Sequence, residues 1–256
     1  MNDYRQHVVA ILFFPFSLLI AVPFSHAGVE EDISELKKDV SEIKKELQEI
    51  KRLLRPCSPF LQKPPTPSLS EASIDDDPIL GDKDAPLTLI EFSDYQCAFC
   101  GRFSRDILPW IKREYIDTGK VRYVFRDYPL PFHKNSMKAA EAAQCAGDQG
   151  RYWEMHDLIF ENQQTMESGD LKGFAERIGL DIEAFSTCLD TNRYAGEVRK
   201  DVEAGRRAGV GVTPFFVLGR TTEDGKIKGK VIHGVQSSAF PDLVFKSAIE
   251  ALLKGE

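Results

Sequence analysis

The sequence predicts an α/β head domain preceded by a helix that associates in parallel with copies of itself. Three observations carry this prediction. An apolar stretch at residues 87–92 ends shortly before Cys97 and Cys100, and apolar residues at helical spacing follow. A second apolar stretch begins far downstream, directly after Pro214. Ahead of the head, apolar residues recur in alternating steps of four and three across residues 29–54.

Composition and charge limit the classes of function. The chain has 256 residues, a formal net charge of -7 and a hydrophobic fraction of 42%. No basic run interleaved with aromatic residues accompanies this acidic balance, so we expect no nucleic-acid partner. The apolar fraction is ordinary for a globular protein, and a packed core is feasible over the C-terminal two-thirds.

The N-terminus has the pattern of a secretion signal. A short polar start precedes an apolar stretch at residues 8–22, and Ser-His-Ala at residues 25–27 suits cleavage before Gly28. We predict a signal peptide at residues 1–27. An uncleaved anchor is the alternative, because about 17 apolar residues can just span a bilayer. Either way the rest of the chain is expected in the periplasm or another extracytoplasmic compartment.

Residues 28–55 are predicted to form a coiled-coil oligomerisation helix. The alternating steps of four and three define a heptad seam. The positions flanking the seam carry Asp32, Asp39 and Glu46 on one side and Lys37, Lys44 and Lys51 on the other. Opposite charges face each other only in a parallel assembly, and isoleucine at d positions favours a trimer over a dimer. A single helix folded against its own head is the alternative. The seam consists of Val29, Ile33, Leu36, Val40, Ile43, Leu47, Ile50 and Leu54.

Residues 56–78 are predicted to be an extended linker. Proline recurs through this segment with serine and aspartate between, and proline cannot continue a helix. We therefore expect the head to occupy residues 79–256.

The cysteine pair lies where a strand is followed by the start of a helix. Free N–H groups and the helix dipole stabilise a thiolate at that place and lower the pKa of the first cysteine. We therefore expect Cys97 to be the attacking nucleophile and Cys100 the resolving thiol.

A zinc site and a purely structural disulfide are the alternatives for this pair. A zinc site would need a second Cys or His pair at similar spacing, and the five histidines are scattered, so we expect no metal and no cofactor. A structural disulfide would close a very short loop and stabilise little. Downstream, Pro214 precedes an apolar strand, where a cis peptide bond is a reasonable expectation.

Taken together, the head resembles the DsbA-like branch of the thioredoxin superfamily. The resemblance covers about residues 78–254. Its motifs are FSDYQCAFC at 92–100, YVFRDYPL at 123–130, KAAEAAQCAGD at 138–148, YWEMHDL at 152–158 and GVTPFF at 211–216.

The resemblance implies a thioredoxin-like fold with an inserted helical domain at about residues 136–205. It also implies that Thr213 and Pro214 form a cis-proline loop beside the cysteines, holding substrate backbone. Glu91 matches the buried acidic residue that assists proton transfer in this family; a partly exposed strand carboxylate is the alternative. Many relatives have proline or histidine after the first cysteine where this chain has Ala98, which leaves its redox potential open.

The remaining cysteines have different expected roles. Cys145 and Cys188 both fall in the predicted insertion, and in an exported domain we expect them to form a structural disulfide. A second redox relay is the alternative. Cys57 follows the predicted stalk and either bridges neighbouring subunits or stays a free thiol.

The function predicted from these features is disulfide exchange with exported client proteins that contain cysteines, supported by a membrane redox partner. The stalk and linker favour disulfide isomerase activity as a homo-oligomer, similar to the ScsC-type trimeric isomerases. The alternatives are a monomer-competent dithiol oxidase, a copper-binding envelope protein that uses the same pair, and a structural envelope protein.

Overall fold

The computed structural model describes residues 26–54, 69–232 and 241–255, and the chain divides into two units, residues 1–62 and 63–256. The predicted signal peptide falls mostly outside the described residues, and Cys57 falls outside them altogether. None of the described helices is both long and apolar enough to cross a membrane.

In the first unit, the described residues form one long helix, α1 (His26–Leu54), which matches the predicted helical range closely. Its side chains are described for residues 32–49. The apolar seam lies on the surface of the single chain: Ile33, Leu36, Val40, Ile43 and Leu47 are 44% to 65% exposed. Pairing of this helix with other copies stays a prediction.

The head is built on one mixed six-stranded sheet with the order β1-β6-β5-β3-β4-β2. Among the described strands, β3 and β4 run parallel to each other, and the other neighbours are antiparallel. The strands are β1 (Leu69–Ser73), β2 (Ile79–Leu80), β3 (Leu87–Ser93), β4 (Val121–Asp127), β5 (Phe215–Arg220) and β6 (Lys226–Ile232).

The central strand β3 is buried along its whole length, as the apolar stretch at residues 87–92 predicted. Successive side chains of a strand point to opposite faces of the sheet. Leu87 and Leu89 accordingly enter one core, whereas Ile90 and Phe92 enter the core on the other face. Glu91 follows the same alternation and therefore points to the face of Leu89.

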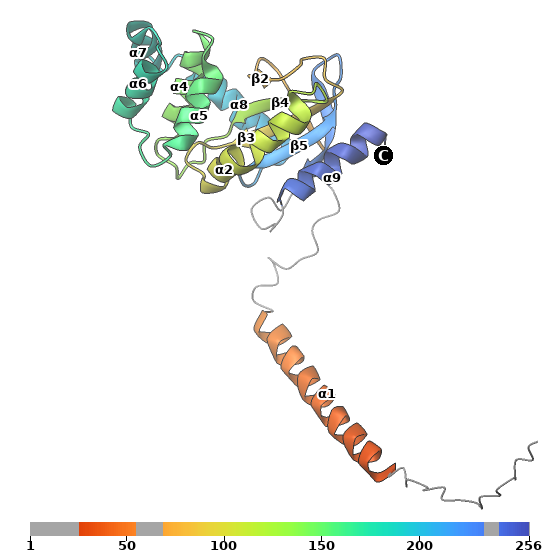
Figure 1. The fold of residues 1–256 in the computed structure, drawn as a ribbon. Coiled ribbons are helices and arrows are strands. Elements are labelled where there is room, and N and C mark those ends of the chain that lie inside the picture. The colour runs from red at the N-terminus through yellow and green to blue at the C-terminus, as the bar shows by residue number, and fades with distance from the viewer. Residues whose placement is uncertain (1–25, 55–68, 233–240, 256) are drawn as a thin grey trace, which may run out of the picture. The chain divides into compact units, whose positions relative to one another are not determined.

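Helices cover both faces of this sheet (Figure 1). Helix α2 (Ala98–Arg102), which contains Cys100, follows β3. Helix α9 (Pro241–Lys254) packs on the same core, where Phe103, Phe216 and Phe245 meet with ring centroids 4.5–5.4 Å apart. Pro109 lies at the start of α3 (Leu108–Ile111), between the π-helical turns η2 (Phe103–Ile107) and η3 (Lys112–Ile116).

Five helices form the insertion between β4 and β5. It begins at Ser136, as predicted, and its last helix ends at Ala208 rather than near residue 205. A disulfide between Cys145 and Cys188 joins its first and fourth helices. The helices are α4 (Ser136–Gly147), α5 (Tyr152–Glu161), α6 (Ser168–Arg177), α7 (Ile182–Asp190) and α8 (Ala195–Ala208).

The predicted linker at residues 56–78 is wrong for its C-terminal part. Leu69–Ser73 form the edge strand β1, which pairs with β6, and Ile74 is buried in the core beneath it. The sequence carries no local sign of this strand, because its five residues are mostly small or polar. Their partners in β6 lie between about 153 and 161 residues downstream. The head therefore includes Leu69, and the boundary at residue 79 is too late.

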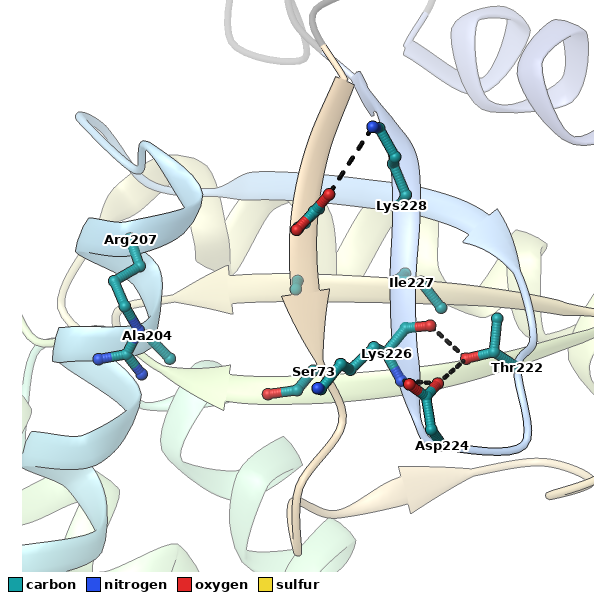
Figure 2. A pocket seen from close by; sticks show the side chains of 10 residues that line it. Ser73, Ala204, Arg207, Thr222, Asp224, Lys226, Ile227 and Lys228 are labelled. Carbon is teal, nitrogen blue, oxygen red and sulfur yellow. Dashed lines mark hydrogen bonds and ion pairs between the residues drawn. The ribbon is translucent and has the colours of Figure 1, made fainter.

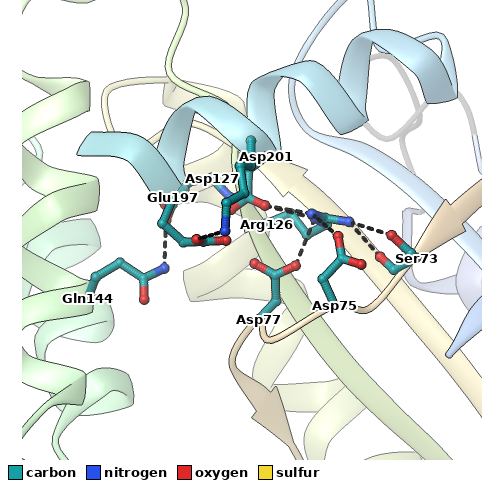
Figure 3. A network of polar contacts seen from close by, with 9 residues as sticks. Ser73, Asp75, Asp77, Arg126, Asp127, Gln144, Glu197 and Asp201 are labelled. Atoms are coloured by element: carbon teal, nitrogen blue, oxygen red, sulfur yellow. Dashed lines mark hydrogen bonds and ion pairs between the residues drawn. The ribbon is translucent and has the colours of Figure 1, made fainter. Parts of the chain in front are cut away.

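A buried ionic network fixes this N-terminal segment to the sheet (Figure 3). The guanidinium of Arg126 lies 2.8 Å from Asp77 and 2.6 Å from Asp201, and it also contacts Asp75 at 3.0 Å. Arg126 is 1% exposed. Burial raises the pKa of Asp77 to about 10 and that of Asp127 to about 8, and the neighbouring charge of Asp201 adds to both. One cation on β4 thus pairs with carboxyls from two other segments, the stretch after β1 and helix α8.

We predict that Arg126→Met destabilises the head by about 3–5 kcal/mol, because it leaves several buried carboxyls without their cation. Arg122→Met is the matched control on the same strand. Arg122 donates to the Thr88 hydroxyl and the Lys83 carbonyl and has no comparable carboxylate cluster among the described residues. Urea unfolding of both variants measures the difference; equal losses would contradict the proposed anchoring role of the network.

Candidate active site

The redox pair stands at the junction of β3 and α2. Cys97 is the residue immediately before the helix, with extended backbone angles (φ -71°, ψ 119°), and its carbonyl accepts the helical bond from the Gly101 N–H at 3.1 Å. Cys100 lies one turn further along. Both cysteines are free thiols, so the structure describes the dithiol form.

Cys97 has the environment of a reactive thiolate. Cys97 is 8% exposed, and its thiol donates to the Thr213 carbonyl at 3.4 Å. The pKa of Cys97 is lowered to about 6, chiefly by a hydrogen bond from the Cys100 thiol. The Thr213 side chain and the backbone N–H groups of Cys100 and Phe99 lower the pKa further, while burial opposes them. These surroundings therefore favour the thiolate form of Cys97.

Cys100 has the opposite environment. Its side chain is completely buried, and the Asp94 N–H donates to its sulfur at 3.5 Å. Burial, together with the hydrogen bond to Cys97 and the nearby charge of Glu91, raises the pKa of Cys100 well above its usual range. The pKa values of the two thiols are therefore shifted in opposite directions, although the cysteines belong to one helical turn.

Glu91 is a buried carboxyl below the cysteine pair. It is 1% exposed, so the alternative of a partly exposed strand carboxylate is wrong. Ser93 donates to one oxygen and Tyr123 to the other, both at 2.6 Å. Burial raises the pKa of Glu91 to about 8. A carboxyl with this pKa can take up and release a proton near neutral pH.

Thr213 and Pro214 complete the site from the other side. Their peptide bond is cis, and Thr213 is 4% exposed. Because the Thr213 carbonyl accepts from Cys97, the structure brings together residues separated by 116 positions in the chain. Cys97, Cys100, Glu91 and the Thr213–Pro214 loop thus form one site.

Asp94, which the sequence patterns do not single out, organises the turn before Cys97. Its buried carboxylate accepts hydrogen bonds from the Gln96 N–H at 2.7 Å and the Leu130 N–H at 2.6 Å. It also accepts from the Ser136 hydroxyl at 2.7 Å and lies 2.9 Å from His133. Asp94 falls inside the FSDYQCAFC motif, but the motif alone does not reveal that its partners lie in the loop and helix after β4.

Large apolar side chains are exposed on segments that belong to or contact this site. Phe99, between the two cysteines, is 46% exposed, and Val212, before the cis-proline loop, is 63% exposed. Phe132 is 71% exposed on the loop that Asp94 anchors through Leu130 and His133.

The Cys145–Cys188 disulfide and a hollow beside β1 and β6 involve none of the residues of this site. Cys145 and Cys188 are both about 1% exposed, inside the core of the insertion. A hollow of about 470 Å³ lies beside β1 and β6 (Figure 2), where Lys228 pairs with Glu71 and Asp224 accepts from Thr222. None of the described residues that line it is a cysteine or a histidine. Within the described parts of the chain, no cluster of three or more His, Cys, Asp or Glu side chains has the arrangement of a metal site.

Three features together define the class of protein. They are a buried dithiol at a helix N-terminus, a cis-proline loop opposite the dithiol, and a mixed sheet that carries both. A family model described as Thioredoxin matches residues 73–232. Disulfide bond formation protein D of Bacillus subtilis is 34% identical over 159 residues, covering 58% of this chain and 70% of that protein.

Solved structures agree with this assignment. BdbD from Bacillus subtilis superposes with a TM-score of 0.62 at 31% identity, covering 73% of this chain and 98% of that one. The α-DsbA1 of Wolbachia pipientis gives a TM-score of 0.54 at 27% identity, covering 71% and 96%. The present chain belongs to the thioredoxin family, in its DsbA-like branch of thiol–disulfide oxidoreductases.

Other curated relatives are much longer than this chain. The Na(+)/H(+) antiporter NhaA 3 of Salinispora tropica is 40% identical over 148 residues, which cover 57% of this chain and 22% of that protein. The chain therefore spans only about a quarter of the length of these antiporter relatives.

We predict that Glu91→Gln slows the step in which Cys100 gains or loses its proton by about 100-fold, the lower end for a positioned proton-transfer group. Stopped-flow oxidation of the reduced protein by a model disulfide measures this rate. Glu141→Gln is the matched control, because Glu141 is a buried carboxylate on α4, paired with Lys138 at 3.2 Å. Equal rates in the two variants would contradict the role of Glu91.

The same variant has a signature in the pH dependence of stability. The folded pKa of Glu91, about 8, lies above the ordinary value of 4.5 for a glutamate. Its contribution to stability is therefore fully present below about pH 4.5 and is lost as the pH rises through about 8. Relative to Glu91→Gln, the reduced wild-type protein should lose stability across this window, as measured by urea unfolding at several pH values.

Proposed function

We propose that this chain is an exported protein thiol–disulfide oxidoreductase that exchanges disulfides with cysteine-containing client proteins through Cys97 and Cys100. The observation that carries the proposal is the unequal pair of thiols. Cys97 has a pKa of about 6 and faces the Thr213 carbonyl, while Cys100 is fully buried with a raised pKa. A low-pKa thiolate beside a buried second thiol is the arrangement that this exchange requires.

The proposed reduction of a client begins with the Cys97 thiolate. It attacks one sulfur of a client disulfide, a bond forms between Cys97 and that sulfur, and the other client sulfur leaves as a thiolate. Cys100 then loses its proton and attacks the Cys97 sulfur. The client leaves with two thiols, and the enzyme keeps the Cys97–Cys100 disulfide, so two electrons have passed to the client.

Oxidation of a client is the reverse sequence. A client thiolate attacks Cys97 of the enzyme disulfide, and Cys100 leaves and must be protonated in its buried position. Glu91 has a pKa of about 8, and its charge acts on Cys100, so it is the group we propose for this proton transfer. The stable Cys97 thiolate is then a good leaving group when the second client thiol attacks.

Whether the protein oxidises or isomerises client disulfides in the cell depends on how its subunits assemble and on what supplies it with electrons. For isomerisation the dithiol form attacks a wrong disulfide and is later displaced by another client thiol, with no net electron transfer. We propose that the seam of α1 joins heads in a parallel homo-oligomer, a trimer by the isoleucine pattern, so that several Cys97 sites act on one client. The matched acidic and basic flanks support a parallel arrangement, and a membrane redox partner would keep the sites reduced.

We predict that the mature chain reactivates a test protein with scrambled disulfides, whereas a version that starts at Lys63 oxidises thiols but reactivates poorly. Lys63 is the right start, because a start at Ile79 would remove β1 and the Asp75 and Asp77 partners of Arg126. Sedimentation should show an oligomer for the full chain and a monomer for the shorter version.

A matched pair of point variants separates assembly from length. Leu36→Lys places a charge in the exposed seam and should lose both assembly and most reactivation, while Ser41→Lys, outside the seam, should keep both. Full reactivation by the monomeric version would show that isomerase activity does not need the stalk. Oxidation of thiols without reactivation by either version would instead identify a dithiol oxidase.

A further inference from the structure

A glutamine of the helical insertion contacts the backbone of the redox turn. Gln163 lies two residues beyond the end of α5 and about 65 residues downstream of the cysteines in the chain. Its side-chain amide nitrogen donates to the Tyr95 carbonyl at 2.8 Å and to the Cys97 carbonyl at 3.0 Å. One side chain therefore holds two carbonyl groups at the start of the redox turn.

The Cys97 carbonyl has a second partner of structural importance. It accepts the Gly101 N–H at 3.1 Å, the first hydrogen bond of helix α2. The following N–H groups, of Phe99 and Cys100, face the Cys97 sulfur and help lower its pKa. Any movement of the Cys97 carbonyl therefore moves the donors that stabilise the thiolate.

The chain has a glycine where Gln163 needs space. A β-carbon placed on Gly101 would collide with the Gln163 Oε1 and lie 2.8 Å from the Arg105 guanidinium. Arg105 in turn donates to the same Oε1 at 3.3 Å and to the Phe160 carbonyl at 2.9 Å, which fixes the amide with its nitrogen toward the turn. Gly101 is helical, where alanine would normally be favoured.

We propose that Gln163 is a positioning residue of the redox site: its amide clamps the Tyr95 and Cys97 carbonyls and thereby fixes the donors around the Cys97 sulfur. The clamp connects the helical insertion directly to the reactive turn. Gly101 is part of it, because only a residue without a side chain leaves room for the amide. The biological meaning of the clamp rests on the proposed function, but the state of the Cys97 thiol can be measured without turnover.

Loss of the clamp has a defined electrostatic consequence. Without the amide, the turn relaxes and the Phe99 and Cys100 N–H groups stabilise the thiolate less well. A carboxylate at position 163 goes further, since it repels the Tyr95 and Cys97 carbonyls and adds a negative charge near the thiolate. The thiolate form of Cys97 should therefore be less stable in Gln163→Met than in wild type, and less stable still in Gln163→Glu.

The experiment is a pH titration of the reduced full chain, following the ultraviolet absorbance of the thiolate, with Cys97→Ser subtracted in each background. We expect the Cys97 midpoint to rise from about 6 by about half a unit in Gln163→Met and by about one unit in Gln163→Glu. Gln149→Glu is the matched control, because Gln149 also binds backbone within the insertion, at Asp181, but not at the redox turn. It should leave the midpoint unchanged.

Gly101→Ala separates positioning from general stability. The alanine favours the helix, which offsets part of the stability lost with the Gln163 hydrogen bonds. It displaces Gln163 and should raise the Cys97 midpoint as Gln163→Met does. Combining it with Gln163→Met should add nothing, because both remove the same contact. If Gln163→Glu does not fold, Gly101→Ala and Gln163→Met still test the proposal.

Unchanged Cys97 midpoints in Gln163→Met and Gly101→Ala would overturn the proposal, and so would fully additive shifts in the double variant. The outcome for the proposed function is read separately. If the protein shows the shifts but exchanges no disulfides, the proposed clamp is supported and the proposed function is contradicted. If the protein exchanges disulfides but the variants show no shifts, the proposed function is supported and the proposed clamp is contradicted.

Discussion

The chemistry of this protein depends on the unequal solvation of two sulfur atoms within one turn of helix. Cys97 precedes the helix and meets its first N–H groups, whereas Cys100 is turned into the core with no exposed surface. The first position favours the thiolate and the second favours the thiol. The buried strand β3, the cis Thr213–Pro214 loop and the helix start are all needed to create this difference, since each contributes to the surroundings of one of the sulfurs.

The buried carboxyls of the head illustrate two different uses of charge in a core. On one face of the sheet, Asp77, Asp201 and their neighbours surround Arg126, and the cation stabilises a cluster that joins the segment after β1 to β4 and α8. On the opposite face, Glu91 is held by the neutral hydroxyls of Ser93 and Tyr123. With hydroxyls rather than a cation at both oxygens, burial raises its pKa to about 8, in the range where proton transfer is useful. The first group is therefore structural, and the second is suited to chemistry.

The parts of the site that the sequence predicted are those with local signals. The apolar stretch before Cys97, the helical spacing after Cys100 and the proline at the start of β5 each have a signature within a few residues. The parts that the sequence did not predict depend on distant partners. The strand at Leu69–Ser73 is held by distant partners, namely β6, Ala208 and Arg126. Gln163 has no pattern around it that marks contact with Cys97. The extent of the insertion came from the family resemblance, because no periodicity sets where a set of helices begins and ends.

The most direct test of the central claim is the capture of mixed disulfides by single-cysteine variants. In Cys100→Ser the Cys97 thiolate can attack a client disulfide, but no second thiol of the site resolves the mixed disulfide that forms. Covalent complexes should therefore accumulate with a test protein whose disulfides have been reduced and re-formed. In Cys97→Ser the buried Cys100 thiol should form almost none. Mass spectrometry of the complexes identifies the linked cysteine. Complexes through Cys100, or equal amounts from the two variants, would contradict the account of an attacking Cys97 thiolate and a buried resolving thiol.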